Sequence, residues 1–402
     1  MMIKRYIVTY SVIVSFISSV LVFNSSAVGD PNQYDLREIT NIVQKMDISS
    51  LKSKASILLE ADGGAVLYEN NSHMRLPIAS ITKTMSMLLI MEEIDSGKLK
   101  LDDLVEVSAY ATTMGGSQAY LKEGEKFTVR DMLKAIAIHS SNDVTVAMAE
   151  KISGSESAFV TMMNEKSDKL GMKDTHFIDC TGLTDEGHYS TAYDIALLSK
   201  ELVIKHPGIL EFTSIWHDTF REGKFSLDNT NKLLNFYKGV DGLKTGFTTL
   251  AGYCLSATAK INDIRLITVI LGSPDTNTRF AETKKLLDFG FANIEKNIVL
   301  TKGEEIQEVE VKNGVQAKVK AVVGNDLKLA VLKDQKDNIT KEINLEQSIV
   351  APIKAGQKIG EIRYHLNGEV IGRIDLVSDK NYEKASFIRL IIRKMLTLLR
   401  IK

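Results

Sequence analysis

The chain is poor in cysteine and proline. Its 402 residues include only two cysteines, Cys180 and Cys254, and five prolines. Two cysteines allow at most one internal bridge, which excludes a small fold held together by disulfides. We expect two free, partly buried thiols rather than a disulfide. A content of 44% hydrophobic and 25% charged residues excludes a disordered, collagen-like or coiled-coil chain and allows sizeable cores.

The chain also lacks an excess of charge of either sign. Lysine and arginine number 50, and aspartate and glutamate number 51, which gives a formal net charge of -1. No overall field draws such a protein to nucleic acid, so we expect no nucleic-acid partner. The seven histidines contain no His-Glu-x-x-His run. We therefore predict neither a metal site nor another cofactor.

The first residues have the pattern of a secretory signal peptide. Lys4 and Arg5 precede residues 6–23, which are apolar or hydroxylic without charge, and residues 25–27 are small. We predict a signal peptide over residues 1–27 and export of the mature chain. An uncleaved anchor helix is the alternative, because the apolar run is somewhat long for a signal peptide.

Residues 34–297 mix helical and strand patterns. Helices are expected from about Ser80 to Glu93 and over 143–151, 156–170 and 279–288, and strands over 55–61, 65–68, 253–259 and 264–271. Thr128 and Thr191 are each followed three residues later by an aspartate, which predicts two further helix starts. This order of elements predicts an α+β domain with an antiparallel sheet.

Residues 298–378 change to short alternating patterns typical of strands. These patterns cover 308–312, 316–322, 327–332 and 358–364. Asn367-Gly368 between two such runs is a strong hairpin signal. We predict a small all-β domain without obvious chemistry.

The tail, residues 380–402, is basic and amphipathic. It contains seven basic residues against one acidic residue, and Arg389, Arg393 and Arg400 recur at helical spacing opposite apolar side chains. A helix of this kind is typical of the surface of an anionic membrane, and we predict that it attaches the protein there. Packing of its apolar face on the β domain is the alternative.

The first motif that can carry chemistry is Ser80-x-x-Lys83, at a predicted helix start. Positions i and i+3 lie on one helix face, so the hydroxyl and the amine are expected to be neighbours. A hydroxyl is a weak nucleophile that needs a base, and burial lets a lysine serve as one by disfavouring its charged form. The motif is weak alone, since a second Ser-x-x-Lys begins at Ser49 without such a setting.

The second motif is Ser140-Ser141-Asn142, which interrupts an otherwise helical run. A loop between two helices can place a hydroxyl that passes protons and an amide that binds a substrate carbonyl. Because serine and asparagine also favour helix N-termini, a simple helix cap is the alternative interpretation.

The third motif is Lys244-Thr245-Gly246, which precedes a strand-like segment. An edge strand can pair with an extended peptide, and lysine and threonine can hold the terminal carboxylate of that peptide. Glycine lets the ligand approach the backbone. A loop lysine without a role is the alternative.

The three motifs together resemble the penicillin-recognising serine hydrolases. The second motif follows the first by 60 residues, and the third follows the second by another 104. Within these hydrolases the chain is similar to the low-molecular-mass penicillin-binding proteins that are D-alanyl-D-alanine carboxypeptidases. The resemblance covers about residues 34–378. It includes the segments Arg75-Leu76-Pro77-Ile78-Ala79, Thr113-Met114-Gly115-Gly116-Ser117, Cys180-Thr181-Gly182-Leu183 and Glu186-Gly187-His188-Tyr189-Ser190.

The resemblance implies a fold and a substrate. The fold is a β-lactamase/transpeptidase-like domain, with an antiparallel sheet, helices and a helical subdomain. The substrate is a peptidoglycan stem peptide that ends in D-Ala-D-Ala, and β-lactams are expected to acylate the same serine. The basic tail matches the membrane-surface tether that such carboxypeptidases often carry.

The resemblance also implies a role for each motif residue. Ser80 is the acylated nucleophile and Lys83 is its base. Ser140 relays the proton to the leaving D-alanine, and Asn142 holds the acyl-side amide. The terminal carboxylate is bound by Lys244 and Thr245, with Gly246 beside them. Backbone N–H groups, including that of Ser80, form the oxyanion hole.

Some features depart from the family or leave alternatives open. Phe247 follows the third motif where some relatives carry histidine, and Arg279 is only a candidate for an additional carboxylate ligand. A class A β-lactamase is one alternative, but no Glu-x-x-x-Asn block lies between Ser140 and Lys244. A wall-binding scaffold protein without turnover is the other alternative, although all three motifs are intact.

Overall fold

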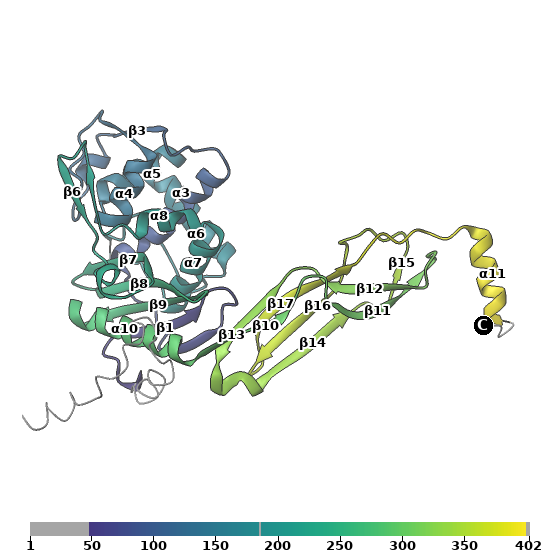
Figure 1. The fold of residues 1–402 in the computed structure, drawn as a ribbon. Helices are drawn as coiled ribbons and strands as arrows, with labels where there is room; N and C mark the ends of the chain where they lie inside the picture. The colour runs from purple at the N-terminus through teal and green to yellow at the C-terminus, as the bar shows by residue number, and fades with distance from the viewer. Residues whose placement is uncertain (1–47, 185, 399–402) are drawn as a thin grey trace, which may run out of the picture. The chain divides into compact units, whose positions relative to one another are not determined.

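The computed structural model describes residues 48–184 and 186–398. The predicted signal peptide, residues 1–27, lies outside the described residues. The chain forms an α+β region, from η1 (Ile48–Ser50) to α10 (Thr276–Asn293), and then a β region, from β10 (Ile294–Leu300) to β17 (Glu369–Ser378). Helix α11 (Phe387–Leu398) follows (Figure 1). The boundary predicted after Asn297 falls within β10.

The α+β region is built on a five-stranded antiparallel sheet with the order β2-β1-β9-β8-β7. The strands are β1 (Ala55–Glu60), β2 (Val66–Asn70), β7 (Val240–Thr248), β8 (Gly252–Ile261) and β9 (Ile264–Ser273). Successive β1 side chains point to opposite faces, so Leu58 packs in the core beneath α10 while Ile57 and Leu59 join the larger core on the other face. Figure 1 shows α10 on one side of the sheet and α7 on the other.

Helices and two small hairpins complete this region. The helices are α3 (Lys83–Asp95), α4 (Val129–Lys134), η4 (Ala135–His139), α5 (Asn142–Ser153), α6 (Glu156–Leu170), α7 (Ala192–Lys205), η5 (Pro207–Ile209), α8 (Leu210–Thr213) and α9 (Leu233–Phe236), and the short turns are η2 (Ala79–Thr82) and η3 (Ala111–Thr113). The hairpins pair β3 (Leu104–Glu106) with β4 (Lys126–Thr128) and β5 (His217–Phe220) with β6 (Phe225–Asp228). The predicted caps are confirmed, because Thr128 and Thr191 accept hydrogen bonds from Asp131 N and Asp194 N.

Helix α3 is buried from Lys83 to Met91, as expected for a helix that is apolar on all sides. The predicted helix start at Ser80 needs a correction, because Ser80 lies in the 3-10 turn η2 and α3 begins at Lys83. Ala79, immediately before Ser80, has a φ of 48°, which is outside the helical region, and contacts with Thr82 and Gly182 hold this backbone.

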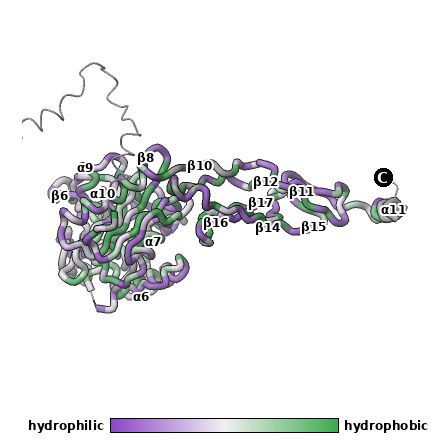
Figure 2. Tube along the Cα trace, turned by 90° about the horizontal axis from the view of Figure 1, so that it is seen from below, coloured by the Kyte–Doolittle hydropathy of each residue, from purple (hydrophilic) through white to green (hydrophobic). Residues whose placement is uncertain are grey.

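The β region has its own apolar core and two sheets. The larger sheet has the order β14-β16-β17-β12-β11-β15, and β10 pairs with β13. The strands are β11 (Glu305–Lys312), β12 (Lys318–Val323), β13 (Leu327–Leu332), β14 (Ile339–Leu345), β15 (Ser348–Val350) and β16 (Lys358–Leu366), with the turn η6 (Lys333–Asn338). Buried residues alternate with more exposed ones over the second half of β11 and along β12. Figure 2 shows hydrophobic and hydrophilic residues mixed along the β region. The predicted hairpin is confirmed: Asn367 and Gly368 both have positive φ between β16 and β17.

Helix α11 exposes large apolar side chains. Phe387, Ile388, Ile391 and Ile392 are 77%, 71%, 44% and 52% exposed. Within the described part of the chain, no helix is both long enough and apolar enough to span a bilayer. These exposed apolar side chains therefore belong to a helix of only twelve residues.

Candidate active site

The site begins at a strained turn. Ser80 is partly exposed in η2, and the residue before it, Ala79, has the left-handed φ of 48°. Thr82 Oγ1 donates to Ala79 O at 2.8 Å and closes this turn. A non-glycine residue in this region costs free energy, so the surrounding contacts must hold the backbone that presents the Ser80 hydroxyl.

Lys83 is fully buried beneath this turn and has three hydrogen-bond partners. Its Nζ lies 3.0 Å from Ser80 Oγ, 2.6 Å from Asn142 Oδ1 and 2.8 Å from Thr181 O. Burial lowers the pKa of Lys83 to about 8, against the opposing fields of Cys180 and nearby carboxylates, which raise it. A lysine with this pKa is neutral in a substantial fraction of molecules near physiological pH, and a neutral amine can accept a proton from Ser80.

Ser140 and Asn142 lie where a π-helical turn, η4, gives way to α5. Ser140 is buried with a left-handed φ of 68°, and Ser141 is the N-cap of α5 without a side-chain capping bond. The side chain of Asn142 accepts from Lys83 and donates to Gly115 O at 2.7 Å. Ser141 thus occupies the cap position of the alternative interpretation, whereas the Asn142 side chain binds Lys83 and the Gly115 carbonyl instead of the helix end.

The third motif lies on β7, the edge strand of the sheet. Lys244 is buried, and its Nζ donates to Thr245 O at 3.0 Å. Burial and the nearby charges of Lys83 and Arg279 lower the pKa of Lys244 well below its ordinary value. Thr245 Oγ1 donates to Thr230 Oγ1 at 2.6 Å. Two hydroxyl groups, from Thr245 on β7 and from Thr230 outside it, thus lie next to each other in the chain's third motif region, where Lys244 is buried.

Gly246 allows β7 to approach the nucleophile turn, η2 (Ala79–Thr82), which carries the predicted nucleophile Ser80. A Cβ atom at Gly246 would lie 2.7 Å from Ile78 O and 3.1 Å from the backbone N atoms of Ser80 and Ile81. These neighbours are backbone atoms that cannot move independently. The absence of a side chain at Gly246 therefore sets the distance between the first and third motifs.

Arg279 lies behind the third motif and is largely buried. Its guanidinium donates to Cys254 O at 3.1 Å and to Gly246 O at 3.4 Å, and lies over the rings of Phe280 and Tyr253. Burial lowers the pKa of Arg279 to about 10. These contacts support the backbone of β7 and β8 and add positive potential there.

Phe247 forms part of the exposed rim of this edge. Its side chain is 53% exposed, and its ring lies 4.4 Å from that of Tyr253. An aromatic pair therefore stands next to the third motif at the position where some relatives carry histidine.

Some residues of the site were not singled out from the sequence. Thr230 follows a loop asparagine, Asn229, and precedes Asn231, and both asparagines are buried and hydrogen-bonded to backbone groups. Asp179 binds the loop that supplies Thr181 O. No short-range pattern connects these residues with Ser80, although Thr181 belongs to a segment that carries the family resemblance.

Both cysteines are free and buried, as expected. Burial raises the pKa of the Cys180 thiol well above its ordinary value and that of Cys254 to about 11. Thiols in this state react slowly, because the thiolate is the nucleophile. Neither cysteine is a competing nucleophile beside Ser80.

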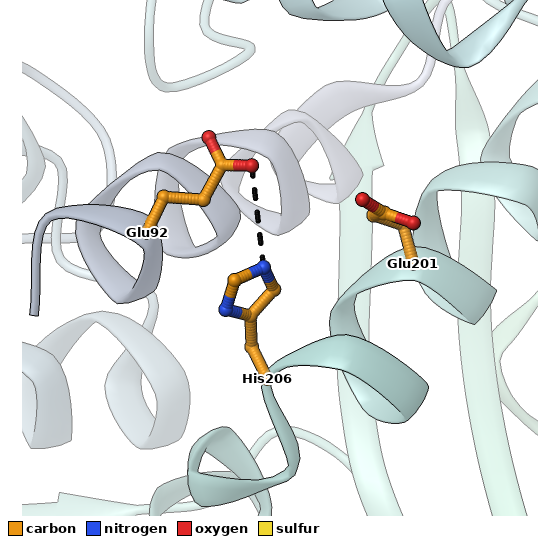
Figure 3. Close-up of side chains that lie close together, drawn as sticks. All are labelled: Glu92, Glu201 and His206. Atoms are coloured by element: carbon orange, nitrogen blue, oxygen red, sulfur yellow. Dashed lines mark ion pairs between the residues drawn. The ribbon is translucent and has the colours of Figure 1, made fainter. Parts of the chain in front are cut away.

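One group of three potential metal ligands occurs among the described residues, away from the three motifs. Figure 3 shows Glu92, Glu201 and His206 directed toward one another. However, Lys166 Nζ lies 2.5 Å from Glu92 and 3.3 Å from Glu201, and His206 Nδ1 lies 2.5 Å from Asp95. An ammonium group on both carboxylates already supplies the positive charge, so this group is an ion-pair network.

Comparison with known proteins agrees with this geometry. The sequence matches the family described as D-alanyl-D-alanine carboxypeptidase over residues 40–275, and the C-terminal domain of penicillin-binding protein 5 over residues 295–384. It is 44% identical to the D-alanyl-D-alanine carboxypeptidase DacF of Bacillus subtilis, over 86% of this chain and 89% of that protein.

Solved structures give the same result. Penicillin-binding protein 5 from Haemophilus influenzae has a TM-score of 0.74 at 32% identity, covering 83% of this chain and 98% of that one. The ampicillin-bound penicillin-binding protein D2 from Listeria monocytogenes has a TM-score of 0.55 at 34% identity, covering 60% and 98%. The chain therefore belongs to the D-alanyl-D-alanine carboxypeptidase family of serine hydrolases.

Proposed function

We propose that this protein removes the terminal D-alanine from peptidoglycan stem pentapeptides through an acyl-enzyme on Ser80, and so limits cross-linking of the wall. The single observation that carries the proposal is the position of Lys83 Nζ, 3.0 Å from Ser80 Oγ, in a buried setting that lowers the pKa of Lys83 to about 8. Family membership supplies the reaction class, and this contact supports Ser80 as the nucleophile.

In the acylation step, neutral Lys83 accepts the proton of Ser80 while Ser80 Oγ attacks the carbonyl carbon of the penultimate D-alanine. The negative charge that develops on the carbonyl oxygen is stabilised by backbone N–H groups, including that of Ser80, each worth about 3 to 4 kcal/mol. Ser140 then relays the proton that Lys83 accepted to the departing amine, so that Lys83 is neutral again and D-alanine leaves. Water hydrolyses the ester and regenerates Ser80 and Lys83.

The remaining motif residues hold the substrate. Asn142 stands beside Lys83 and can bind the amide on the acyl side, since its Nδ2 reaches a backbone carbonyl that a ligand can replace. The Thr245 hydroxyl and the buried charge of Lys244 receive the terminal carboxylate, and Gly246 keeps the peptide close to Ser80. The position of β7 at the edge of the sheet supports binding of the peptide as an added strand.

β-Lactams are expected to acylate Ser80, because their strained amide has the shape of the D-Ala-D-Ala end. The related penicillin-binding protein D2 from Listeria monocytogenes, which has been solved with ampicillin bound, supports this expectation. The proposed steps use neither a metal nor an organic cofactor.

The first experiment combines intact-protein mass spectrometry after penicillin treatment with an assay of D-alanine release from a diacyl-Lys-D-Ala-D-Ala peptide. We expect a stable adduct on Ser80 and D-alanine release, and loss of both in Ser80→Ala. Unchanged D-alanine release by Ser80→Ala would refute the proposal. An adduct without peptide turnover would indicate a binding or scaffold role, and rapid loss of the adduct with hydrolysed penicillin would indicate a β-lactamase.

The localisation follows from the proposed domains. These are a signal peptide over residues 1–27, a catalytic domain over 34–297, a β domain over 298–378 and a membrane-surface helix over 380–402. The exposed apolar side chains of α11 and the basic residues of the tail support attachment to the outer face of the cytoplasmic membrane.

Membrane attachment is tested by flotation of the mature chain with vesicles that contain anionic lipid. A chain ending at residue 379 is the matched control. We expect the longer chain to float and the shorter one to stay at the bottom, with weaker binding at high salt. Equal behaviour of the two chains would exclude attachment through the tail.

A further inference from the structure

The loop Asp179–Thr184 is organised around one carboxylate. The oxygens of Asp179 accept from Thr181 N at 2.7 Å, Thr181 Oγ1 at 2.8 Å, Gly182 N at 2.6 Å and Thr184 N at 2.8 Å. Burial would raise the pKa of Asp179, but the field of His188 and the bonds from Thr184 and Thr181 outweigh it and lower the pKa to about 2. The loop therefore has a permanent anion at its centre.

This loop contributes one of the three partners of Lys83. An ammonium group has three N–H bonds, and those of Lys83 point to Ser80 Oγ, Asn142 Oδ1 and Thr181 O. The direction of the bond to Ser80 is therefore set by the other two. Of those two partners, the Thr181 carbonyl belongs to this loop, so the loop determines its position.

The same loop presses on the nucleophile turn. A Cβ atom at Gly182 would lie 1.9 Å from Ala79 O and 2.6 Å from Thr82 Oγ1. Gly182 has a φ of 77°, and its N–H is one of the donors to Asp179. The loop thus contacts the residue before Ser80 as well as the amine below it.

A buried histidine ties the other end of this segment to the same turn. Ile178 N lies 3.2 Å from His188 Nδ1, and His188 Nε2 lies 2.7 Å from Thr82 Oγ1. Thr82 Oγ1 in turn donates to Ala79 O. Loop, lysine and nucleophile turn are therefore linked by one continuous set of hydrogen bonds.

We propose that Asp179 is a positioning residue for Lys83: its carboxylate fixes the Thr181 carbonyl against Lys83 Nζ and so aligns the amine with Ser80. Asp179 touches neither the reacting atoms nor, by its position inside the loop, the substrate. The inference rests on the proposed role of Lys83 as the base and goes beyond it, because it names the group that keeps the base in place.

The charges that face Lys83 give this role a signature in the pH profile. Asp179, Cys180 and Asp143 of α5 raise the pKa of Lys83, and Lys83 and Lys244 repel each other. Replacing Asp179 with asparagine removes a negative charge and also loosens the Thr181 carbonyl. Both changes destabilise the ammonium form of Lys83, so the pH below which acylation slows moves to a lower value.

The test compares full-length wild type, Asp179→Asn and the control Asp174→Asn, whose exposed carboxylate pairs with Arg75. Penicillin acylation and peptide turnover are measured between pH 5 and 10. For Asp179→Asn we expect a plateau rate lower by about tenfold to hundredfold, a KM within about twofold of wild type and an acid limb at lower pH. The control is expected to match wild type.

Three results would overturn the proposal: an unchanged plateau, a rise in KM with kcat preserved, or a lower plateau with an unmoved acid limb, which a purely structural role would give. If Asp179→Asn does not fold, the variant Thr181→Val tests the proposal instead. It removes the hydrogen bond from Thr181 Oγ1 to Asp179 and keeps the backbone carbonyl of residue 181. We expect a plateau loss of about twofold to fivefold there, and no loss would refute the proposal. Retention of the wild-type rate by Lys83→Met would refute the proposed role of Lys83 as the base, whatever the result for Asp179→Asn.

Discussion

The active site and the β region differ in how their charged side chains are paired. Around Ser80, the cations Lys83 and Lys244 are buried, and their described hydrogen bonds go to neutral oxygens. In the β region, the largely buried Glu361 is instead paired with three cations of β16 and β17, Arg363, Arg373 and Lys358.

The difference shows in which part of the molecule an unpaired charged side chain is buried despite the unfavourable free energy of burial. A buried cation without a counter-ion is unfavourable and has a lowered pKa. A buried amine of this kind does not stabilise a sheet. Its lowered pKa, however, is what a base needs in order to work near neutral pH. The β region instead combines an apolar core with a largely buried carboxylate that is paired with cations, and this arrangement supports a fold without supplying a reactive group.

Replacement of Lys83 with methionine is expected to have the largest effect on activity and only a small effect on stability. The variant has no base for Ser80, so acylation is expected to fall by about 10²- to 10⁴-fold. Loss of a buried cation is favourable, whereas Asn142 Oδ1 and Thr181 O lose a donor, so the free energy of unfolding should change by less than about 2 kcal/mol. Penicillin acylation and urea unfolding test this. A large loss of stability would show that Lys83 is kept for the fold.

Gly246→Ala tests how closely the site must be assembled. The added Cβ would meet the backbone of Ile78 and Ser80, so β7 must move away from the nucleophile turn. We expect acylation to slow by about a hundredfold with the fold retained. Gly208→Ala is the control, because its Cβ would meet only the flexible end of Met91. Equal rates in the two variants would mean that the spacing is not critical.

Thr230→Val tests the hydroxyl that meets Thr245. A neutral hydrogen bond contributes about 1 kcal/mol, so we expect kcat/KM for a peptide with a free carboxylate to fall about fivefold. Thr219→Val, at an exposed position on β5, provides the comparison. If both variants keep the wild-type kcat/KM, the carboxylate end does not depend on Thr230.

Glu361→Gln is expected to have the smallest effect on activity, with acylation unchanged. The bond from Arg373 is the main cause that lowers the pKa of Glu361 to about 2. Its contribution to stability is therefore complete above the ordinary glutamate pKa and is lost as the pH falls toward 2. Unfolding of wild type, Glu361→Gln and the exposed-pair control Glu308→Gln is compared at pH 7 and pH 3. A slower acylation in Glu361→Gln would link the β region to the site.

Local patterns in the sequence predicted much of the fold. The caps at Thr128 and Thr191 and the turn at Asn367-Gly368 involve residues within a few positions of one another, so their signals are short-range. The three motifs could be found because each is a short string in a fixed order. In the fold, Lys83 Nζ contacts Ser80 and Asn142, and Gly246 lies against the backbone of Ser80, so the three strings lie close together.

Long-range contacts account for what the sequence did not predict. Thr181 and Thr230 contact Lys83 and Thr245, which lie 98 and 15 positions away in the chain, and their own neighbours give no sign of this. The start of α3 was misplaced because the left-handed backbone at Ala79 is imposed by Thr82, Gly182 and the packing around them. The sequence also left Arg279 as a candidate ligand, while in the fold it donates to the carbonyls of Gly246 and Cys254.

The most direct test of the account is the rate of penicillin acylation of Ser80 as a function of pH, followed by intact-protein mass spectrometry. Lys83 must be neutral to accept the proton, so the rate should be half-maximal near pH 8 and fall about tenfold per pH unit below it. In Lys83→Met this limb should disappear together with most of the rate. A rate that is independent of pH between 6 and 9, or an unchanged limb in Lys83→Met, would contradict the assignment of Lys83 as the base.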